Sequence, residues 1–348
     1  MINEHMNIVV LAAGTSSARD VSIVSGTGVC RALRERGHRA ILVDVFFGID
    51  TVDWDDPFPA VYDIGSAAAR MHEDSQHLEE AMRSRREFFG TNVISLCKKA
   101  DVTFLALHGA NGEDGRLQAA FDLLGIKYTG TGYLSSALAM DKKMTKQCLQ
   151  AAGIPVPGGI TLVKGKFDEI PLPGTYGMDY PIVVKPCCGG SSVGTSIVFS
   201  EPEYMDALKE SFALEPEAVI EPYIGGREFS VAVIGDEAYP IIEIAPIQGF
   251  YDYKNKYSAG AVIETCPAEL SEEKTREMQE LAVRGAEALG ITGYCRFDFL
   301  MNKKGELFAL EANTLPGMTP TSLVPQEAAA LGISYPELCE LLIEKSFE

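Results

Sequence analysis

A lysine followed by a run of small residues is the first feature of the sequence that could do chemistry. Lys185 ends an apolar stretch and precedes a loop rich in glycine and serine, Gly189–Gly194. Small residues let backbone amides approach an anion closely, and a lysine at the rim adds positive charge. In a Walker loop the lysine directly follows the last glycine and a helix begins, whereas here a strand follows. The segment predicts either a hairpin that folds over a polyphosphate or an ordinary glycine-rich hairpin with a solvated lysine.

Two acids and an amide near the C-terminus form the second candidate site. Side chains alternate between the faces of a strand, so Arg296 and Asp298 share one face. Glu311 and Asn313 share a face of the next strand, and a turn near residues 304–305 sets Asp298 opposite Glu311. Like charges across a sheet destabilise it unless a cation neutralises them, and hard oxygen ligands suit Mg²⁺. The alternative is that these acids lie on the solvated face of a hairpin.

Two further motifs are weaker candidates for binding sites. Gly26 and Gly28, with Asp44 as a ribose acid, suggest a dinucleotide fingerprint, but the third glycine is absent and both lie inside a predicted helix. His72 and His77 are five residues apart, so their rings point about 140° apart on a helix and do not share a metal.

The amino-acid composition limits the classes to which the protein could belong. The chain has 348 residues, 46% hydrophobic and 23% charged, as expected for a globular protein of two or three domains. The formal net charge of −19 disfavours nucleic-acid and membrane partners, because long-range repulsion opposes binding to anionic surfaces. No apolar run approaches the ~18–20 residues of a membrane helix, and the polar N-terminus shows no signal peptide.

The eight cysteines contain no Cys-x-x-Cys pair, so neither a zinc knuckle nor a thioredoxin-like site is indicated. The adjacent Cys187 and Cys188 lie in the glycine-rich loop, which favours a role in backbone geometry over redox chemistry. With no export signal, a reducing cytoplasm is the expected location.

The predicted elements that position these residues divide the chain into thirds. The first third predicts a doubly wound α/β domain, with strands at 7–13, 40–45 and 102–107 and helices at 21–36 and 77–86. The middle predicts a small α+β domain, with helices at 134–151 and 203–211 and strands at 181–185, 195–199 and 218–221. The last third predicts strands at 229–234 and 239–245, a long loop to about 266, a helix at 271–289, a hairpin of 293–301 with 306–312, and a helix near 336–345.

Eight segments, in order and at similar spacing, resemble the D-alanine–D-alanine ligase family of the ATP-grasp superfamily from Val9 to about the C-terminus. They are GTSSARDVS (14–22), LHGANGEDGRLQ (107–118), YTGTGYLSSALAMDKKMTK (128–146), VVKPCCGGSSVG (183–194), IEPYIGGREFSVAVIG (220–235), GFYDYKNKY (249–257), CRFDF (295–299) and LEANTLPGMTPTSLVP (310–325). The resemblance implies an ATP-grasp fold with an N-terminal doubly wound α/β domain (1–130), a central α+β domain (131–222) and a C-terminal α+β domain (223–348).

The resemblance also implies the ligands and the residues that hold them. ATP would lie between the last two domains, with two Mg²⁺ ions, or Mn²⁺, on Asp298, Glu311 and Asn313. The residues that match ATP contacts are Lys142, Lys185, Ser192, Glu221, Tyr223, Ile224 and Glu228. Those that match catalytic positions are Ser191 and Tyr257 near the first substrate, Lys256 on a loop that closes the site, and Arg296 with the Gly317 amide at the oxyanion. Those that match substrate contacts are His108, Glu113, Ser322 and Leu323.

The implied reaction joins two D-alanines through an acyl phosphate for peptidoglycan synthesis, in a homodimer. Tyr257, rather than histidine, is typical of members whose second substrate is an amino acid. Ala18 replaces the family glutamate that holds the first ammonium, and losing a charged partner costs roughly 1.5–3 kcal/mol. Asp20 is expected to point elsewhere, so either another acid such as Glu113 compensates or the first substrate differs. The alternatives are another amino acid, such as D-serine at the second site, and a non-catalytic nucleotide-binding homologue.

Overall fold

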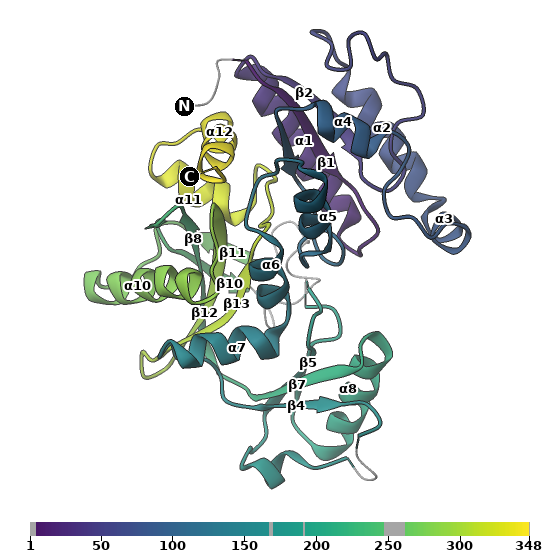
Figure 1. The fold of residues 1–348 in the computed structure, drawn as a ribbon. Helices are drawn as coiled ribbons and strands as arrows, with labels where there is room; N and C mark the ends of the chain where they lie inside the picture. Colours follow the sequence, from purple (N-terminus) through teal and green to yellow (C-terminus); the bar gives the residue numbers. More distant parts are fainter. Residues whose placement is uncertain (1–4, 167–169, 191, 247–261, 348) are drawn as a thin grey trace.

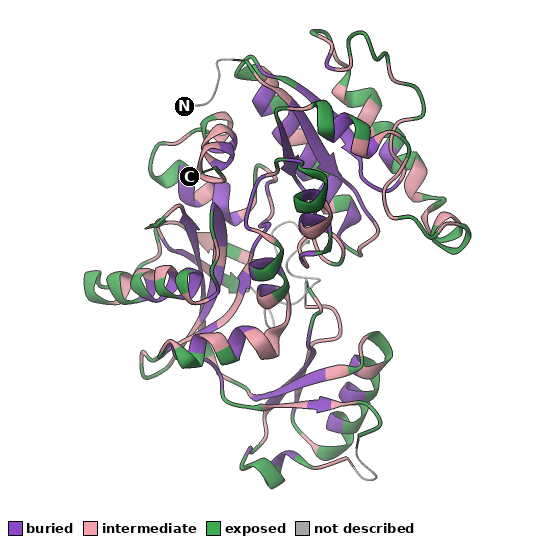
Figure 2. Ribbon diagram, in the orientation of Figure 1, coloured by how far each residue is buried: buried purple, intermediate pink, exposed green. Residues whose placement is uncertain are grey.

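The computed structural model describes residues 5–166, 170–190, 192–246 and 262–347. These residues contain three β-sheets with helices packed against them (Figure 1). The first is parallel, in the order β2-β1-β3: β1 (Asn7–Ala12), β2 (Arg39–Asp44) and β3 (Val102–Leu105). Helix α1 (Arg19–Glu35) packs on β1 and β2, and α4 (Val93–Lys99) packs on β1. β1 is almost fully buried (Figure 2), as its unbroken apolar run predicts. The predicted α/β organisation is confirmed.

Residues 50–92 hold more helix than expected. Besides α3 (Leu78–Ser84), which the sequence predicts, α2 (Ile64–Ser75) begins at Asp63, whose side chain accepts a hydrogen bond from Ser66 N. Arg19 fixes α2 to the sheet: its guanidinium pairs with Asp44 at 2.5 Å and donates to Met71 O at 3.1 Å. Asp44 therefore serves an internal ion pair.

The helix predicted across residues 134–151 is two helices. α6 (Tyr133–Met140) ends at Asp141, which has φ −84° and ψ 102°, and α7 (Lys142–Ala151) follows. The Asp141 carboxylate accepts from Met144 N at 3.0 Å, so the chain leaves the helical conformation to make an N-cap. The continuous apolar spacing concealed this break, which makes Lys142 the first residue of a new helix.

The central sheet is antiparallel, in the order β4-β7-β5-β6: β4 (Ile160–Val163), β7 (Glu217–Pro222), β5 (Ile182–Pro186) and β6 (Ser196–Val198). The sequence predicts all but β4. Helix α8 (Glu201–Leu214) packs on it and completes a core of its own around Tyr204 and Leu208.

The C-terminal sheet has the path β11-β10-β8-β12-β13. The strand predicted at 239–245 is confirmed over residues 242–245 as β10 (Ile242–Pro246), but it begins later than predicted, because Pro240 lies between β9 (Glu237–Ala238) and β10. The predicted loop to 266 is wrong at its end, where β11 (Val262–Thr265) pairs with β10. The other strands of this sheet are β8 (Gly226–Ile234), β12 (Tyr294–Asn302) and β13 (Leu307–Asn313).

The remaining helices of the described chain lie in all three parts. They are α5 (Arg116–Leu124), the short 3-10 helix η1 (Pro173–Tyr176), α10 (Glu272–Ala288), α11 (Leu323–Ala330) and α12 (Tyr335–Lys345).

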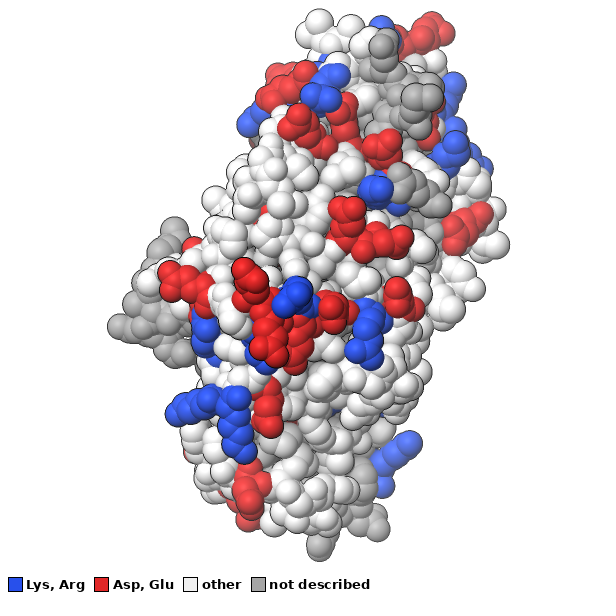
Figure 3. Space-filling view, turned by 90° about the vertical axis from the view of Figure 1, so that its left-hand side faces the viewer, with Lys and Arg blue, Asp and Glu red and all other residues white. Residues whose placement is uncertain are grey.

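The surface charge and the hydrophobicity of the helices are relevant to nucleic-acid and membrane partners. Acidic and basic side chains are interspersed on the face in Figure 3, where no continuous basic surface shows among the described residues. No described helix combines the length and hydrophobicity needed to cross a bilayer.

Gly26 lets α1 lie close to the N-terminal sheet, which gives the discounted glycine motif a packing role. A Cβ atom there would lie 2.5 Å from Ala12 Cβ and 3.0 Å from Leu42 Cδ1. Ala12 Cβ is attached directly to the backbone of β1, so it cannot yield without moving that strand.

We therefore expect Gly26→Ala to lower the free energy of unfolding by about 1–3 kcal/mol, the usual cost of overpacking. This holds although alanine favours helix by about 1 kcal/mol. The matched control is Gly65→Ala in α2, where the nearest atom is the Asp63 carboxylate at 3.3 Å. Urea denaturation of both variants measures the difference, and equal stabilities would contradict the packing role.

Candidate active site

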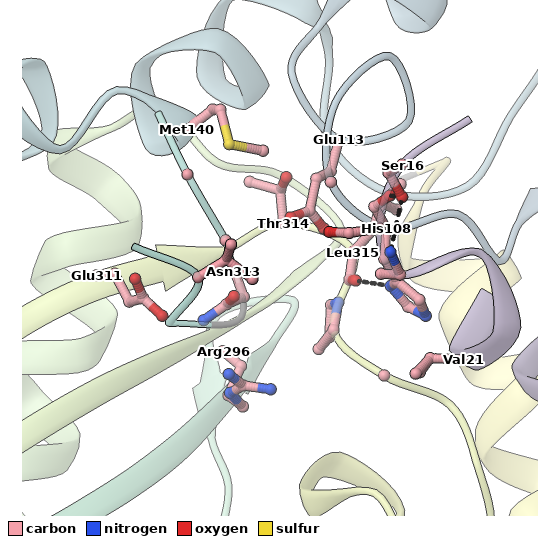
Figure 4. A pocket seen from close by; sticks show the side chains of 18 of the residues that line it. Ser16, Val21, His108, Glu113, Met140, Arg296, Glu311, Asn313, Thr314 and Leu315 are labelled. Atoms are coloured by element: carbon pink, nitrogen blue, oxygen red, sulfur yellow. Dashed lines mark hydrogen bonds between the residues drawn. The ribbon is translucent and has the colours of Figure 1, made fainter. Parts of the chain in front are cut away.

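A cavity of about 1020 Å³ opens where the three sheets meet, and residues from all three parts of the chain line it (Figure 4). It brings together nine of the residues that the sequence proposes for the site. They are His108, Glu113, Lys142, Arg296, Glu311, Asn313, Gly317, Ser322 and Leu323.

The β12–β13 hairpin has the predicted register. Asp298 is paired with Glu311, and Arg296 with Asn313. Phe297 turns to the other face and is fully buried, as strand alternation requires. Arg296, Glu311 and Asn313 face the cavity in Figure 4.

Asp298 is the centre of a polar network. The Arg296 guanidinium donates to both of its oxygens, at 2.9 and 2.8 Å, Ser230 Oγ donates at 3.0 Å and Asn313 Nδ2 at 3.2 Å. With 4% of its surface exposed, Asp298 does not lie on a solvated face, so that alternative is wrong for this acid. Ser230 was not proposed from the sequence, although alternation from Glu228 along β8 puts it on the same face.

Lys142 is held between the hairpin and the glycine-rich loop. Its Nζ donates to Gly189 O at 2.5 Å and lies 3.5 Å from Glu311 Oε2. Its side chain is 11% exposed, although the expected continuous helix would leave it in solvent. The helix break at Asp141 accounts for this change.

Glu221 on β7 joins two lysines. Lys185 Nζ lies 2.7 Å from Glu221 Oε2, and Lys146 pairs with Oε1. Burial would raise the pKa of Glu221, but the Lys185 and Lys146 charges outweigh it and lower that pKa. A solvated Lys185 is therefore wrong. Lys146 was missed, although it lies one helical turn after Lys142.

Among the described residues proposed for ATP, Lys142 alone lines the cavity, whereas Lys185, Glu221 and the remaining four do not. Tyr223 is 40% exposed and donates its backbone N–H to Pro181 O at 3.0 Å. Ile224 is half-buried, Glu228 lies in β8, and Ser192 has φ 59°. Ser191, Lys256 and Tyr257 lie outside the described residues.

His108 joins the N-terminal sheet to the loop after β13. Its Nδ1 lies 3.0 Å from Leu315 O, which can only accept, so Nδ1 carries the proton (Figure 4). Nε2 then accepts from Ser25 Oγ at 3.3 Å, and Ser25 Oγ accepts from Met318 N. Burial lowers the pKa of His108 to about 4, so the imidazole is neutral near pH 7.

Glu113 also faces the cavity. Burial raises its pKa to about 7, and the nearby Glu311 charge adds to that rise while Arg296 and Lys142 oppose it. Ala18 lines the cavity at the start of α1, as does Asp20. The Asp20 carboxylate is largely exposed and lies 3.9 Å from His72 Nδ1, which agrees with the expectation that Asp20 points elsewhere. Residues two positions apart on a helix lie about 200° apart, so Asp20 does not take the place of an acid at position 18.

The loop before α11 is built around Ser322. Its Oγ accepts from Thr319 N at 3.0 Å. A Cβ atom on Gly317 would lie 2.9 Å from that oxygen, so this position has no room for a side chain.

Glu327 on α11 is a buried acid that was not proposed from the sequence. Its Oε2 accepts from Ala232 N at 2.5 Å, and Oε1 has no hydrogen-bond partner among the described residues. Burial raises its pKa well above the ordinary value, because an apolar surrounding favours the neutral form of a carboxyl group. A lone acid in the apolar run after Leu323 was the available signal.

The raised pKa of Glu113 predicts a pH-dependent stability. The folded protein binds this proton more tightly than the unfolded chain, whose ordinary pKa is 4.5. The stabilisation is therefore complete below about pH 4.5 and is lost as pH rises through about 7. Between about pH 5 and 8, without Mg²⁺ or ATP, we expect the unfolding free energy to fall more for the natural protein than for Glu113→Gln. Urea denaturation tests this, with the exposed Glu280→Gln as control; identical pH dependence would contradict it.

Comparisons with known proteins agree with this geometry. A family model described as the D-ala D-ala ligase N-terminus matches residues 7–131, and one described as the C-terminus matches residues 148–344. A D-alanine–D-alanine ligase of Pediococcus pentosaceus is 42% identical, over 97% of each chain.

Solved structures give the same result. D-alanine–D-alanine ligase from Bacillus anthracis, complexed with ATP, is 30% identical with a TM-score of 0.74, covering 98% of this chain and 97% of that one. The VanG D-Ala:D-Ser ligase of Enterococcus faecalis is 27% identical with a TM-score of 0.76, covering 99% of this chain and all of the other (100%). The expected ATP-grasp fold is confirmed, and the chain belongs to the D-alanine–D-alanine ligase family.

Proposed function

We propose that the protein joins two D-alanines at the expense of ATP, giving D-alanyl-D-alanine for peptidoglycan synthesis. The observation that carries the proposal is the convergence of Lys142, Arg296 and Glu311 on one cavity. The set places two cations beside carboxylates, as transfer of a phosphoryl group to a carboxylic acid requires. We further propose a homodimer, and domain boundaries near residues 130 and 222.

The residues that would hold magnesium are Asp298, Glu311 and Asn313. Their oxygen donors fit this hard cation, and the register brings the two acids together. When bound, two Mg²⁺ ions, or Mn²⁺ in their place, would offset charge on the ATP phosphates.

The proposed reaction has two steps. A carboxylate is a poor electrophile, so the first D-alanine takes the γ-phosphoryl group of ATP, becomes an acyl phosphate and releases ADP. The second amine then attacks the carbonyl carbon, and phosphate leaves as the amide forms. Lys142, Lys185 and Ser192 would hold the phosphates, while Glu221, Tyr223, Ile224 and Glu228 would hold the nucleoside.

Arg296 and the Gly317 N–H would stabilise the tetrahedral oxyanion. Asp298 holds the guanidinium through two hydrogen bonds, which fixes its direction before the substrate arrives. His108 fixes Leu315, two residues before Gly317. Ser322 and Leu323 would bind the second carboxylate, while Ser191, Lys256 and Tyr257 would contact and enclose the substrates.

A second candidate is the same chemistry with a different amino acid at either site, for example D-serine at the second. Ala18 favours a different first substrate, since a methyl group cannot accept a hydrogen bond from an ammonium, and the likeness to a D-Ala:D-Ser ligase fits a different second substrate.

Phosphate release with Mg²⁺ and ATP across a panel of D- and L-amino acids tests these functions. Turnover with D-alanine alone supports the proposal. Turnover only with a mixed pair supports the second candidate, and tight ATP binding without turnover supports a non-catalytic homologue.

We expect Asp298→Asn and Glu311→Gln each to lower turnover by about 10²–10³-fold, because each removes charge from the site that faces the phosphates. Glu306→Gln, in the turn of the same hairpin, is the control and should keep full turnover. Phosphate release measures all three, and circular dichroism checks folding. Normal turnover in either site variant would refute the metal assignment.

Restoring an acid at the first subsite gives a separate prediction. If Ala18 leaves the first ammonium short of a partner, Ala18→Glu should lower the KM for D-alanine by about tenfold or more. Ala18→Gln has the same size without the charge and should change KM little. An unchanged or raised KM for Ala18→Glu would show that another group, such as Glu113, already fills this role.

A further inference from the structure

Two adjacent thiols and a carboxylate lie together where α7 begins. Cys187 is buried directly after β5, and Cys188 is exposed on the cavity wall. The Cys187 thiol donates to Asp141 Oδ1 at 3.3 Å. One ligand atom from each of the three residues lies within 4.8 Å of the other two, which no other trio of His, Cys, Asp or Glu among the described residues matches.

This donor set differs from that of the hairpin acids. Two sulfurs and one oxygen suit a borderline-soft cation, whereas carboxylate and amide oxygens suit Mg²⁺. Zinc–sulfur bonds are about 2.3 Å long, so the donors need to draw together by about 1 Å to enclose an ion. Cys188 is exposed, which lets an ion enter, and its N–H donates to Glu215 Oε2 at 2.7 Å, which fixes its backbone.

We infer that Asp141, Cys187 and Cys188 form a binding site for a thiophilic divalent cation of the Zn²⁺ class. Binding releases both thiol protons, so the ion is held by two thiolates and a carboxylate, with water completing a tetrahedron.

The site has a consequence that rests on the proposed function. Lys142 follows Asp141, its N–H donates to Cys187 O at 2.9 Å, and its Nζ donates to Gly189 O. An ion joining Asp141 to both cysteines would fix the start of α7 to the first residues of the glycine-rich loop. A loop held in this way cannot adjust around the ATP phosphates, so zinc would slow turnover.

Absorption with Co²⁺ tests the site without any assay of activity. Thiolate-bound Co²⁺ has an intense charge-transfer band in the near ultraviolet, whereas Co²⁺ on oxygen ligands lacks it. We expect this band in the reduced natural protein, its displacement by Zn²⁺, and its loss in Cys188→Ser. Asp141→Asn retains a capping side chain and should weaken Co²⁺ binding by about tenfold or more.

The matched control is Cys148→Ser, which changes a half-buried cysteine in α7, the helix that Asp141 caps. This variant should keep the band. Circular dichroism and thermal unfolding check that each variant is folded. Absence of the band in the natural protein, or its persistence in Cys188→Ser, would overturn the site.

Phosphate release with saturating Mg²⁺ and ATP tests the consequence, with each rate divided by the zinc-free rate of the same variant. Zn²⁺ should inhibit the natural protein and Cys148→Ser more strongly than Cys188→Ser. Equal inhibition would overturn the regulatory role. If no amino acid gives turnover, the proposed function fails, while the Co²⁺ spectrum still decides the site.

Discussion

The fold depends on how the β12–β13 hairpin holds two carboxylates opposite each other. Asp298 and Glu311 face across the strands, and this arrangement is tolerated only because a cation lies beside each. Arg296 binds the first through two hydrogen bonds, and Lys142 approaches the second at 3.5 Å. The two cations come from different parts of the chain. The ion pair of Lys142 with Glu311 therefore also brings the start of α7 and the glycine-rich loop to the cavity.

The same logic of compensation recurs away from the hairpin. Glu221 is buried between Lys146 and Lys185, and Arg19 is buried against Asp44. Burying an unpaired charge costs free energy because the charge loses its hydration. Removing one partner of either pair would therefore leave the other as a buried, uncompensated charge. Lys146–Glu221 and Arg19–Asp44 join helices to strands, and Lys185–Glu221 joins two strands of the central sheet.

Much of this could be predicted from the sequence, because strand alternation and turn position determine a register. The pairing of Asp298 with Glu311 followed from counting residues around the turn. The break at Asp141 could not be predicted this way, since the apolar spacing runs through it and only the local cap competes with the helix. Lys146 and Glu327 were missed for a related reason: the partners that make them informative are distant in sequence.

The hydrogen bond between His108 and Leu315 has a mechanical consequence. It ties the N-terminal sheet to the loop after β13, and one continuous hydrophobic core extends from β1 to α11 and α12. The central sheet has a separate core around Leu208. The N-terminal and C-terminal parts therefore share one apolar core, so separating them would expose hydrophobic surface to water, whereas the central sheet meets α7 through ion pairs such as Lys146–Glu221.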